Sequence, residues 1–176
     1  MVGYRRNFIP GGTYFFTVTL KDRHSTLLTQ YIEHLRHAFR KARKDRPFQI
    51  DAIVILPEHL HTIWTLPNND TDYPKRWRII KSQFTRNIKK SGVDLKSNLR
   101  GEHKLWQPRY WEHTIKDDDD LLRHVDYIHY NPVKHGLVNR VIDWPHSSFH
   151  QYLKNGVLAV DWGSEPLQND KNQFGE

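Results

Sequence analysis

Two different spacings of apolar residues divide the chain into seven predicted elements. Stretches rich in β-branched and aromatic residues, bounded by turn residues, predict strands at 13–20, 48–56, 59–66 and 106–115. Apolar residues at helical spacing predict amphipathic helices at 27–44, 73–90 and 117–130. The expected core positions of the last helix are Leu121, Leu122, Val125 and Ile128. Asn131-Pro132 is expected to end that helix, because proline disfavours a helical conformation of the residue before it.

The order of these elements predicts an α+β fold. Strand, helix, strand, strand, helix, strand matches a ferredoxin-like arrangement, in which an antiparallel sheet carries its helices on one face. The helix at 117–130 is an addition to this arrangement. We expect one domain over residues 1–152, with a basic N-terminal arm. The rest, 153–176, is expected to be a tail that is partly disordered.

The charge of the chain favours phosphate-rich partners. It has 176 residues, with 27 Lys and Arg against 20 Asp and Glu, a formal net charge of +7 and a pI of about 9.6. A basic surface of this kind suits nucleic acid, although an ordinary basic soluble protein has the same composition. Aromatic residues are interleaved with Arg and Lys at 4–6, 75–78 and 109–111. Such interleaving suits neutralisation of a phosphate backbone together with base stacking.

Several classes of site and location are excluded by what the chain lacks. It contains no cysteine, so disulfides and thiolate metal sites are ruled out. No apolar stretch has the length of a membrane span. The N-terminus does not have the pattern of a secretory signal. We therefore expect a cytoplasmic protein.

A pair of histidines provides the first candidate metal ligands. His59 and His61 lie one residue apart on a predicted strand, so their side chains point to the same face. Imidazole is the commonest metal ligand among side chains. The alternative is a pair of surface histidines on a half-exposed strand, and the spacing alone does not decide between the two. No third histidine lies nearby in sequence, so a further ligand must come from elsewhere in the fold.

A tyrosine and an asparagine on the last predicted helix provide a nucleophile and an oxygen ligand. Tyr127 and Asn131 are four residues apart and therefore share a helix face. The alternative is that Tyr127 packs at the rim of the core and Asn131 caps the helix. Tyr130 is a rival nucleophile, but it points away from the face of Tyr127. The acidic run 117–120 is expected to cap the helix rather than to bind metal.

Taken together, the motifs of the chain resemble those of the REP-associated tyrosine transposases, which belong to the single-tyrosine HUH transposases. The matching motifs are YRR at 4–6, PGGTYFFT at 10–17, LPEHLH at 56–61, WQPRYWEH at 106–113, YIHYNPVKHGLV at 127–138 and DWPHSS at 143–148. The resemblance implies a ferredoxin-like catalytic domain with His59 and His61 as the HUH histidines and Tyr127 as the nucleophile. Related transposases have glutamine where this chain has Asn131. The resemblance also implies a substrate of single-stranded DNA, at repetitive extragenic palindromes that fold into hairpins beside a short conserved tetranucleotide.

The expected activity is that of a metal-dependent, site-specific DNA endonuclease and strand transferase. Tyr127 would form a 5′-phosphotyrosine, and Mg²⁺ or Mn²⁺ would be held by His59, His61 and Asn131. Two alternatives are a hairpin-binding protein without chemistry and a metal-dependent nuclease that activates water. The protein would act as a monomer or homodimer. The residues predicted to contact DNA are Tyr4, Arg5, Arg6, Arg78, Lys81, Arg86, Arg109 and Lys134.

Overall fold

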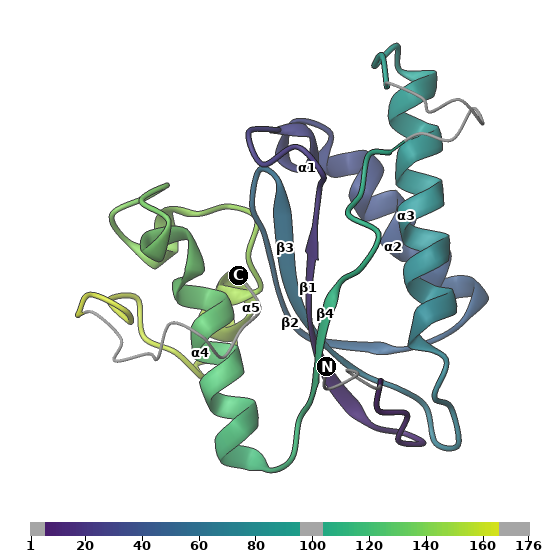
Figure 1. Ribbon diagram of the computed structural model, residues 1–176. Coiled ribbons are helices and arrows are strands. Elements are labelled where there is room, and N and C mark those ends of the chain that lie inside the picture. The colour runs from purple at the N-terminus through teal and green to yellow at the C-terminus, as the bar shows by residue number, and fades with distance from the viewer. Residues whose placement is uncertain (1–5, 96–103, 166–176) are drawn as a thin grey trace, which may run out of the picture.

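A four-stranded antiparallel sheet forms the centre of the molecule (Figure 1). The computed structural model describes residues 6–95 and 104–165, so Tyr4, Arg5 and the end of the predicted tail lie outside the described residues. The strands are β1 Thr13–Thr19, β2 Gln49–Ile55, β3 His59–Thr65 and β4 Trp111–Thr114, in the order β2-β3-β1-β4. The helices are α1 Leu27–Gln30, α2 Ile32–Asp45, α3 Tyr73–Lys90, α4 Asp118–Lys134 and α5 Phe149–Lys154, with a 3₁₀ helix at Val141–Asp143. This order and pairing confirm the predicted ferredoxin-like fold.

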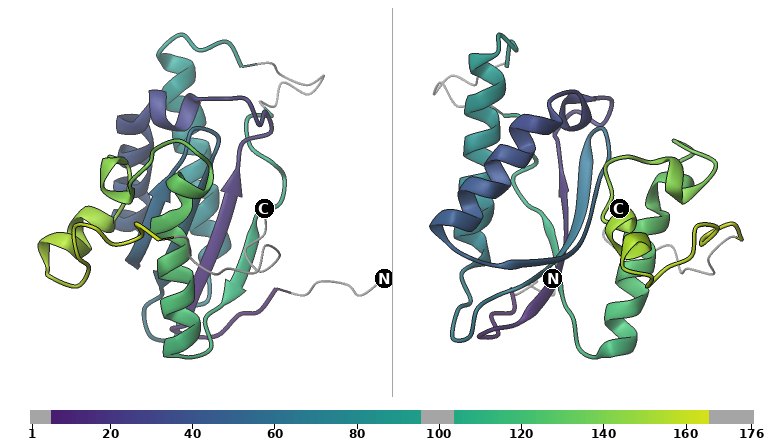
Figure 2. Two further views of the ribbon diagram at one scale, coloured as in Figure 1. Left: turned by 90° about the vertical axis from the view of Figure 1, so that its left-hand side faces the viewer. Right: turned by 180° about the vertical axis from the view of Figure 1, so that it is seen from behind.

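The sheet separates two groups of helices, as Figure 2 shows. Alternate residues of β1 serve opposite faces, because successive side chains of a strand point to opposite sides. Tyr14, Phe16 and Val18 join the larger apolar core under α2 and α3. Phe15 joins a second core that contains Val125 and other residues of α4. The two helices predicted to cover one face of the sheet are therefore α2 and α3. The additional predicted helix is α4, and it covers the opposite face.

The helix α4 is longer than its sequence pattern predicts. It continues through Pro132 to Lys134, so the predicted end at 130 is wrong. Proline removes only its own N–H donor, and the next turn is closed by a hydrogen bond from the His135 N–H to the Asn131 carbonyl, 3.0 Å. Gly136, with φ of 67°, then ends the helix in the left-handed conformation. Leu122 was also misplaced, because it is 58% exposed and does not belong to the core stripe.

Two other elements differ from their predicted lengths. The predicted helix at 27–44 is divided in two at Tyr31. The predicted strand at 106–115 reduces to β4, while Trp106 makes only an isolated bridge to Leu20. Pro108, which has no N–H to donate, lies between the bridge and the strand, where the register of the pairing shifts. The segment that leads into β4 nevertheless runs beside β1, which brings Trp106 and Tyr110 close to α3.

The end of the described chain packs on α4. The predicted domain boundary at 152 falls inside α5, and Trp162 contacts Phe149 and His129 with ring centroids 6.0 and 6.2 Å away. His129 in turn hydrogen bonds to the Ser148 hydroxyl, 2.9 Å. Among the described residues, no helix combines the length and the apolarity that crossing a membrane requires.

Candidate active site

The strand β3 presents both predicted histidines to the face covered by α4. His59 and His61 are 1% and 0% exposed, so the alternative of two surface histidines is wrong. His61 pairs with Thr17 across the ladder, beside Phe15 and Ile63 of the second core. The two imidazole rings lie edge to face, with centroids 4.9 Å apart. Burial of two polar rings side by side is costly unless they are hydrogen bonded or bind a ligand.

Each imidazole is held at Nδ1 by a neighbouring side chain. The Nδ1 atom of His61 hydrogen bonds to the Thr17 hydroxyl at 2.8 Å, and Nδ1 of His59 lies 2.8 Å from a carboxylate oxygen of Glu58. Burial of Glu58 favours its protonated form, but the hydrogen bond and charge of His59 hold the pKa of Glu58 below its usual value. Metal-binding histidines are oriented by this kind of contact, which leaves Nε2 as the ligand atom.

Tyr127 and Asn131 are buried on the facing helix. Tyr127 is 3% exposed and its ring meets the His61 ring edge-on, with centroids 5.2 Å apart. Tyr127 therefore belongs to the core and not to its rim. Asn131 is fully buried one turn further along α4. Tyr130, the rival nucleophile, lies beside Gly163 on another side of the helix.

The Phe15 side chain of β1 packs between the sheet and α4. Its ring stacks on His61 with centroids 5.6 Å apart, and it also contacts Tyr127 and His124 at 6.2 and 4.8 Å. One aromatic ring thus touches a histidine of the pair, the candidate nucleophile and a histidine of α4.

Lys134 and His135, which both follow Pro132, reach the same site. The Lys134 amine donates a hydrogen bond to the Tyr127 hydroxyl, 3.0 Å, and lies 4.7 Å from the centre of the Tyr127 ring. The His135 ring lies 5.1 Å from that of His59. The sequence placed Lys134 among the DNA contacts and gave His135 no role. The i, i+7 spacing of Tyr127 and Lys134 would have placed them on one helix face if the helix had not been expected to end at 130.

A second cluster of metal-ligating residue types lies beside this site, formed by His113, Asp120 and His124. The Asp120 carboxylate accepts hydrogen bonds from His113 Nε2 at 2.7 Å and from the Lys116 N–H at 3.0 Å. Burial acts against ionisation, yet the His113 bond holds the pKa of Asp120 below its usual value. The other carboxylate oxygen of Asp120 lies 3.3 Å from the Arg123 guanidinium and 3.2 Å from the His124 ring. Because protein donors fill this carboxylate, we interpret the cluster as a tie between β4 and α4.

The acidic run that contains Asp120 also caps the helix, as predicted. The Asp117 side chain accepts the N–H of Asp120 at 2.8 Å. The buried role of Asp120 itself was missed, because a carboxylate in the first turn of a helix is usually solvated and its two histidine partners lie in different elements.

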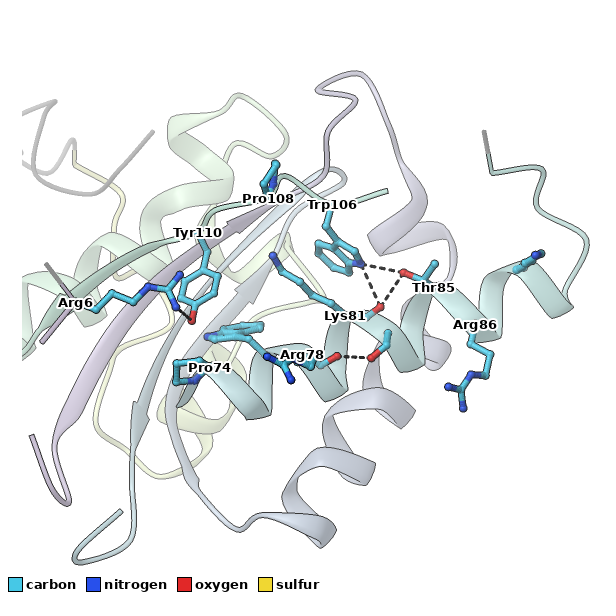
Figure 3. Close-up of a pocket in the computed structure, with 12 residues that line it drawn as sticks. Arg6, Pro74, Arg78, Lys81, Thr85, Arg86, Trp106, Pro108 and Tyr110 are labelled. Atoms are coloured by element: carbon cyan, nitrogen blue, oxygen red, sulfur yellow. Dashed lines mark hydrogen bonds between the residues drawn. The ribbon is translucent and has the colours of Figure 1, made fainter. Parts of the chain in front are cut away.

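Four of the predicted DNA contacts line one groove (Figure 3). The groove lies between α3 and the segment that leads into β4, and its volume is about 670 Å³. Arg78, Lys81 and Arg86 line it from α3, and Arg6 lies at its end beside Tyr110. Arg109 is exposed outside the groove, and Tyr4 and Arg5 lie beyond the described residues.

The interior of this basic groove alternates cations with aromatic rings. Arg6 donates to the Tyr110 hydroxyl at 3.0 Å, and its guanidinium lies 4.5 Å from the centre of that ring. The Lys81 amine lies 5.3 and 5.7 Å from the rings of Tyr110 and Trp106, and donates to the Gln107 carbonyl at 3.2 Å. Burial, reinforced by the nearby charge of Arg6, lowers the pKa of Lys81 to about 8. Lys81 is therefore not on an ordinary solvated helix face.

The groove and the tyrosine site lie on opposite sides of the edge strand β4. Tyr110 packs toward α3, whereas Trp111 pairs with Thr17, whose side chain points toward the histidines. Trp111 is 39% exposed. The strand β4, last in the order of the sheet, thus separates a basic, aromatic groove from a buried tyrosine.

Comparison with known proteins agrees with this geometry. The family of IS200-like transposases matches residues 10–131. A REP-associated tyrosine transposase of Escherichia coli K12 is 50% identical over 165 residues, which cover 94% of this chain and 93% of that protein. A Haemophilus influenzae protein with the name "Putative REP-associated tyrosine transposase" is 47% identical over 168 residues, which cover 94% of this chain and 96% of that protein.

A solved structure extends the similarity to three dimensions. The structure of a REP-associated tyrosine transposase bound to a REP hairpin has 48% sequence identity and a TM-score of 0.87, and the match covers 100% of this chain and 98% of that one. The match takes in the sheet, both groups of helices and the segment that leads into β4. The chain therefore belongs to the IS200-like transposases and, within them, to the REP-associated tyrosine transposases.

Proposed function

We propose that this transposase cuts and rejoins single-stranded DNA beside a hairpin, with Tyr127 as the nucleophile. The observation that carries the proposal is the meeting of α4 with β3. It buries the Tyr127 ring against His61, while both histidines of the pair are oriented through Nδ1. Neither a binding protein nor a purely structural tyrosine needs this arrangement.

The residues at this site fit a divalent metal ion. Two imidazoles from one strand and the amide of Asn131 from the facing helix form a nitrogen and oxygen donor set, which suits Mn²⁺ or Mg²⁺. The contacts from Glu58 and Thr17 supply the outer support that such ligands need. A bound ion would stabilise negative charge on the scissile phosphate.

The reaction is a phosphoryl transfer to the tyrosine oxygen. The Tyr127 hydroxyl oxygen forms a bond to phosphorus as the bond to the 3′-oxygen of the preceding nucleotide breaks. The product is a 5′-phosphotyrosine and a free 3′-hydroxyl. Because the covalent intermediate retains the energy of the phosphodiester, another 3′-hydroxyl can attack it and rejoin the strand.

The basic groove is the proposed site for DNA. The E. coli and solved relatives carry REP in their names, and the solved relative is bound to a REP hairpin. Cations interleaved with aromatic rings neutralise phosphates and stack on unpaired bases. We assign this role to Arg6, Arg78, Lys81 and Arg86, with Tyr4, Arg5 and Arg109 as neighbouring contacts. A DNA substrate also agrees with the cytoplasmic location expected from the sequence, and a monomer or homodimer remains the expected assembly.

The test is a search for a covalent protein–DNA adduct. The protein is incubated with Mn²⁺ and a single-stranded hairpin oligonucleotide that carries unpaired flanks, and the products are separated on a denaturing gel. We expect an adduct with the wild type and with Tyr130→Phe, and none with Tyr127→Phe or in EDTA.

Other outcomes separate the alternative functions. Cleavage without an adduct would make the protein a nuclease that activates water. Hairpin binding without cleavage would make it a binding protein. An adduct formed by Tyr127→Phe and not by Tyr130→Phe would move the nucleophile to Tyr130.

A further inference from the structure

We infer that Lys134 is a catalytic residue of this transposase, and that its amine stabilises the negative charge of the Tyr127 oxygen. The inference rests on the proposed role of Tyr127. It is carried by a direct contact, because Lys134 Nζ lies 3.0 Å from the tyrosine hydroxyl oxygen and donates to it. The contact places a positive charge beside the oxygen atom that would form the bond to phosphorus.

The structure around Lys134 favours this role over that of an ordinary surface lysine. Its amine also lies 4.7 Å from the centre of the Tyr127 ring, so both the ring and the oxygen face the cation. A lysine at the end of a helix is favoured by the helix dipole alone, but that effect needs no particular partner. Here the continuation of α4 through Pro132 and its end at Gly136 bring Lys134 onto the face of Tyr127.

Lys134 acts in this inference as a charge and not as a base. A protonated amine has three donors and no acceptor, so it cannot take the phenol proton. That proton passes to water while the Tyr127 oxygen bonds to phosphorus, and the departing 3′-oxygen takes a proton from water. No proton is consumed overall. When the strand is rejoined, the tyrosine oxygen leaves as a phenolate, and the same amine stabilises it.

Because the same amine acts in cleavage and in rejoining, both steps should depend on it to a similar extent. Removal of one donor aimed at a developing oxyanion slows catalysis by about 100-fold or more. Lys134→Met should therefore slow cleavage and rejoining by a similar factor of about 100, while the fraction of covalent adduct at equilibrium changes little. A residue that only holds DNA would leave both steps near the wild-type rate at saturating substrate, and the loss caused by a residue that only supports the fold would not be restored by an added amine.

The experiment measures both steps with a single-stranded hairpin oligonucleotide that carries unpaired flanks, in Mn²⁺. Cleavage is followed as adduct formation at saturating DNA, and rejoining as the reaction of isolated adduct with an excess of a 3′-hydroxyl oligonucleotide. Lys134→Arg should restore much of the rate, because it keeps the charge. Propylamine should partly restore Lys134→Ala, whereas propanol should not. Lys154→Met, which removes one exposed charge from the end of α5, is the matched control and should match the wild type.

Three results would overturn the inference. The first is a Lys134→Met enzyme within about threefold of the wild-type rates. The second is a variant that loses hairpin affinity and flattens its salt dependence but cleaves normally at saturating DNA, which would make Lys134 a phosphate contact. The third is a slow Lys134→Ala enzyme, whether or not it keeps its full stability, that no amine restores. A wild-type protein that forms no adduct would instead refute the proposed function.

Discussion

The orientation of His61 depends on one hydroxyl group. Thr17 Oγ lies 2.8 Å from His61 Nδ1 and both residues are buried, so water cannot replace the contact. Thr17→Val removes this hydroxyl with little change of volume. Loss of an outer-shell partner of a metal ligand lowers metal affinity by about 10- to 100-fold. We expect Thr17→Val to need correspondingly more Mn²⁺ for cleavage and to reach nearly the wild-type rate when saturated, as a titration of adduct formation against Mn²⁺ would measure.

Thr13→Val is the matched control for this change. Thr13 lies on the same strand and hydrogen bonds to the Thr65 hydroxyl at 2.8 Å, away from the histidines. Its Mn²⁺ dependence should equal that of the wild type. If Thr17→Val and Thr13→Val had the same Mn²⁺ requirement, the hydroxyl of Thr17 would have no role in orienting His61.

Single residues of the site could be predicted from the sequence where one local rule was sufficient. Alternation along a strand placed His59 and His61 on one face, and helical spacing placed Tyr127 and Asn131 together. The contact of Lys134 could not be found by these rules, because it depends on how a helix behaves after a proline. Burial of Asp120 between two histidines depends on packing between distant elements, which spacing along the chain does not report.

Among the elements, α4 carries Tyr127, the proposed nucleophile, and its final turn carries Lys134. That turn ends at Gly136, whose φ of 67° is unfavourable for a residue with a Cβ atom. A Cβ at this position would have nothing within 4 Å, so the penalty of Gly136→Ala is one of backbone conformation alone. We expect a loss of about 1 kcal/mol in the free energy of unfolding, measured in urea, and slower cleavage because the last turn of α4 shifts.

Gly156→Ala separates stability from function in this prediction. Gly156 follows α5 with φ of 70° and also has open space around a Cβ atom, so it carries the same backbone penalty away from the site. It should lose similar stability and keep its cleavage rate. Equal cleavage rates in the two variants would show that the end of α4 does not position catalytic groups.

Two prolines explain why element boundaries were harder to predict than element types. Pro132 stands inside a helix that continues, because later hydrogen bonds and a glycine cap close the last turn. Pro108 lies where the pairing with β1 breaks, since three steps on β1, from Leu20 to Thr17, match five on the other segment, from Trp106 to Trp111. A rule that treats every proline as a boundary is right for the second and wrong for the first, since the outcome depends on which hydrogen bonds surround the missing donor.

In the molecule as a whole, the proposed DNA groove and the proposed catalytic site lie on opposite sides of β4, so binding and cleavage should be separable. The pH dependence of hairpin binding tests whether the two are separable, because burial and the charge of Arg6 lower the pKa of Lys81 to about 8. A bound phosphate favours the charged amine and raises that pKa, so binding takes up a proton above pH about 8. Hairpin affinity should therefore fall as the pH rises, by up to about tenfold between pH 7 and 9, whereas the cleavage rate at saturating DNA should not follow this change.

Lys81→Arg is the control for the pH effect, since arginine stays charged throughout this range. Its affinity, measured by fluorescence anisotropy of a labelled hairpin, should be nearly independent of pH between 7 and 9. A wild-type affinity that is equally independent of pH would mean that Lys81 does not contact phosphate.

The arrangement of the whole molecule was only partly accessible from the sequence. The order of elements was enough to predict the ferredoxin-like sheet, because few topologies fit strand, helix, strand, strand, helix, strand. The meeting of Arg6 with α3 in one groove was not accessible, since it joins residues about 75 positions apart through Tyr110 of a third segment. The sequence predicted DNA contacts in both segments, and only the fold shows that Arg6 and the residues of α3 line the same groove.

Phe15 has a consequence for how this enzyme can change. Its ring packs against both His61 of β3 and Tyr127 of α4, which also contact each other, and it belongs to the second core. Close packing of this ring therefore fixes how Tyr127 lies against His61, and a change of even one methylene group would be felt by its neighbours. A smaller side chain at this position would leave a cavity that the surrounding structure closes only in part, so the contact of Tyr127 with His61 would change. Substitutions that change DNA preference and keep the Tyr127–His61 contact intact are therefore expected outside this core, in the basic groove.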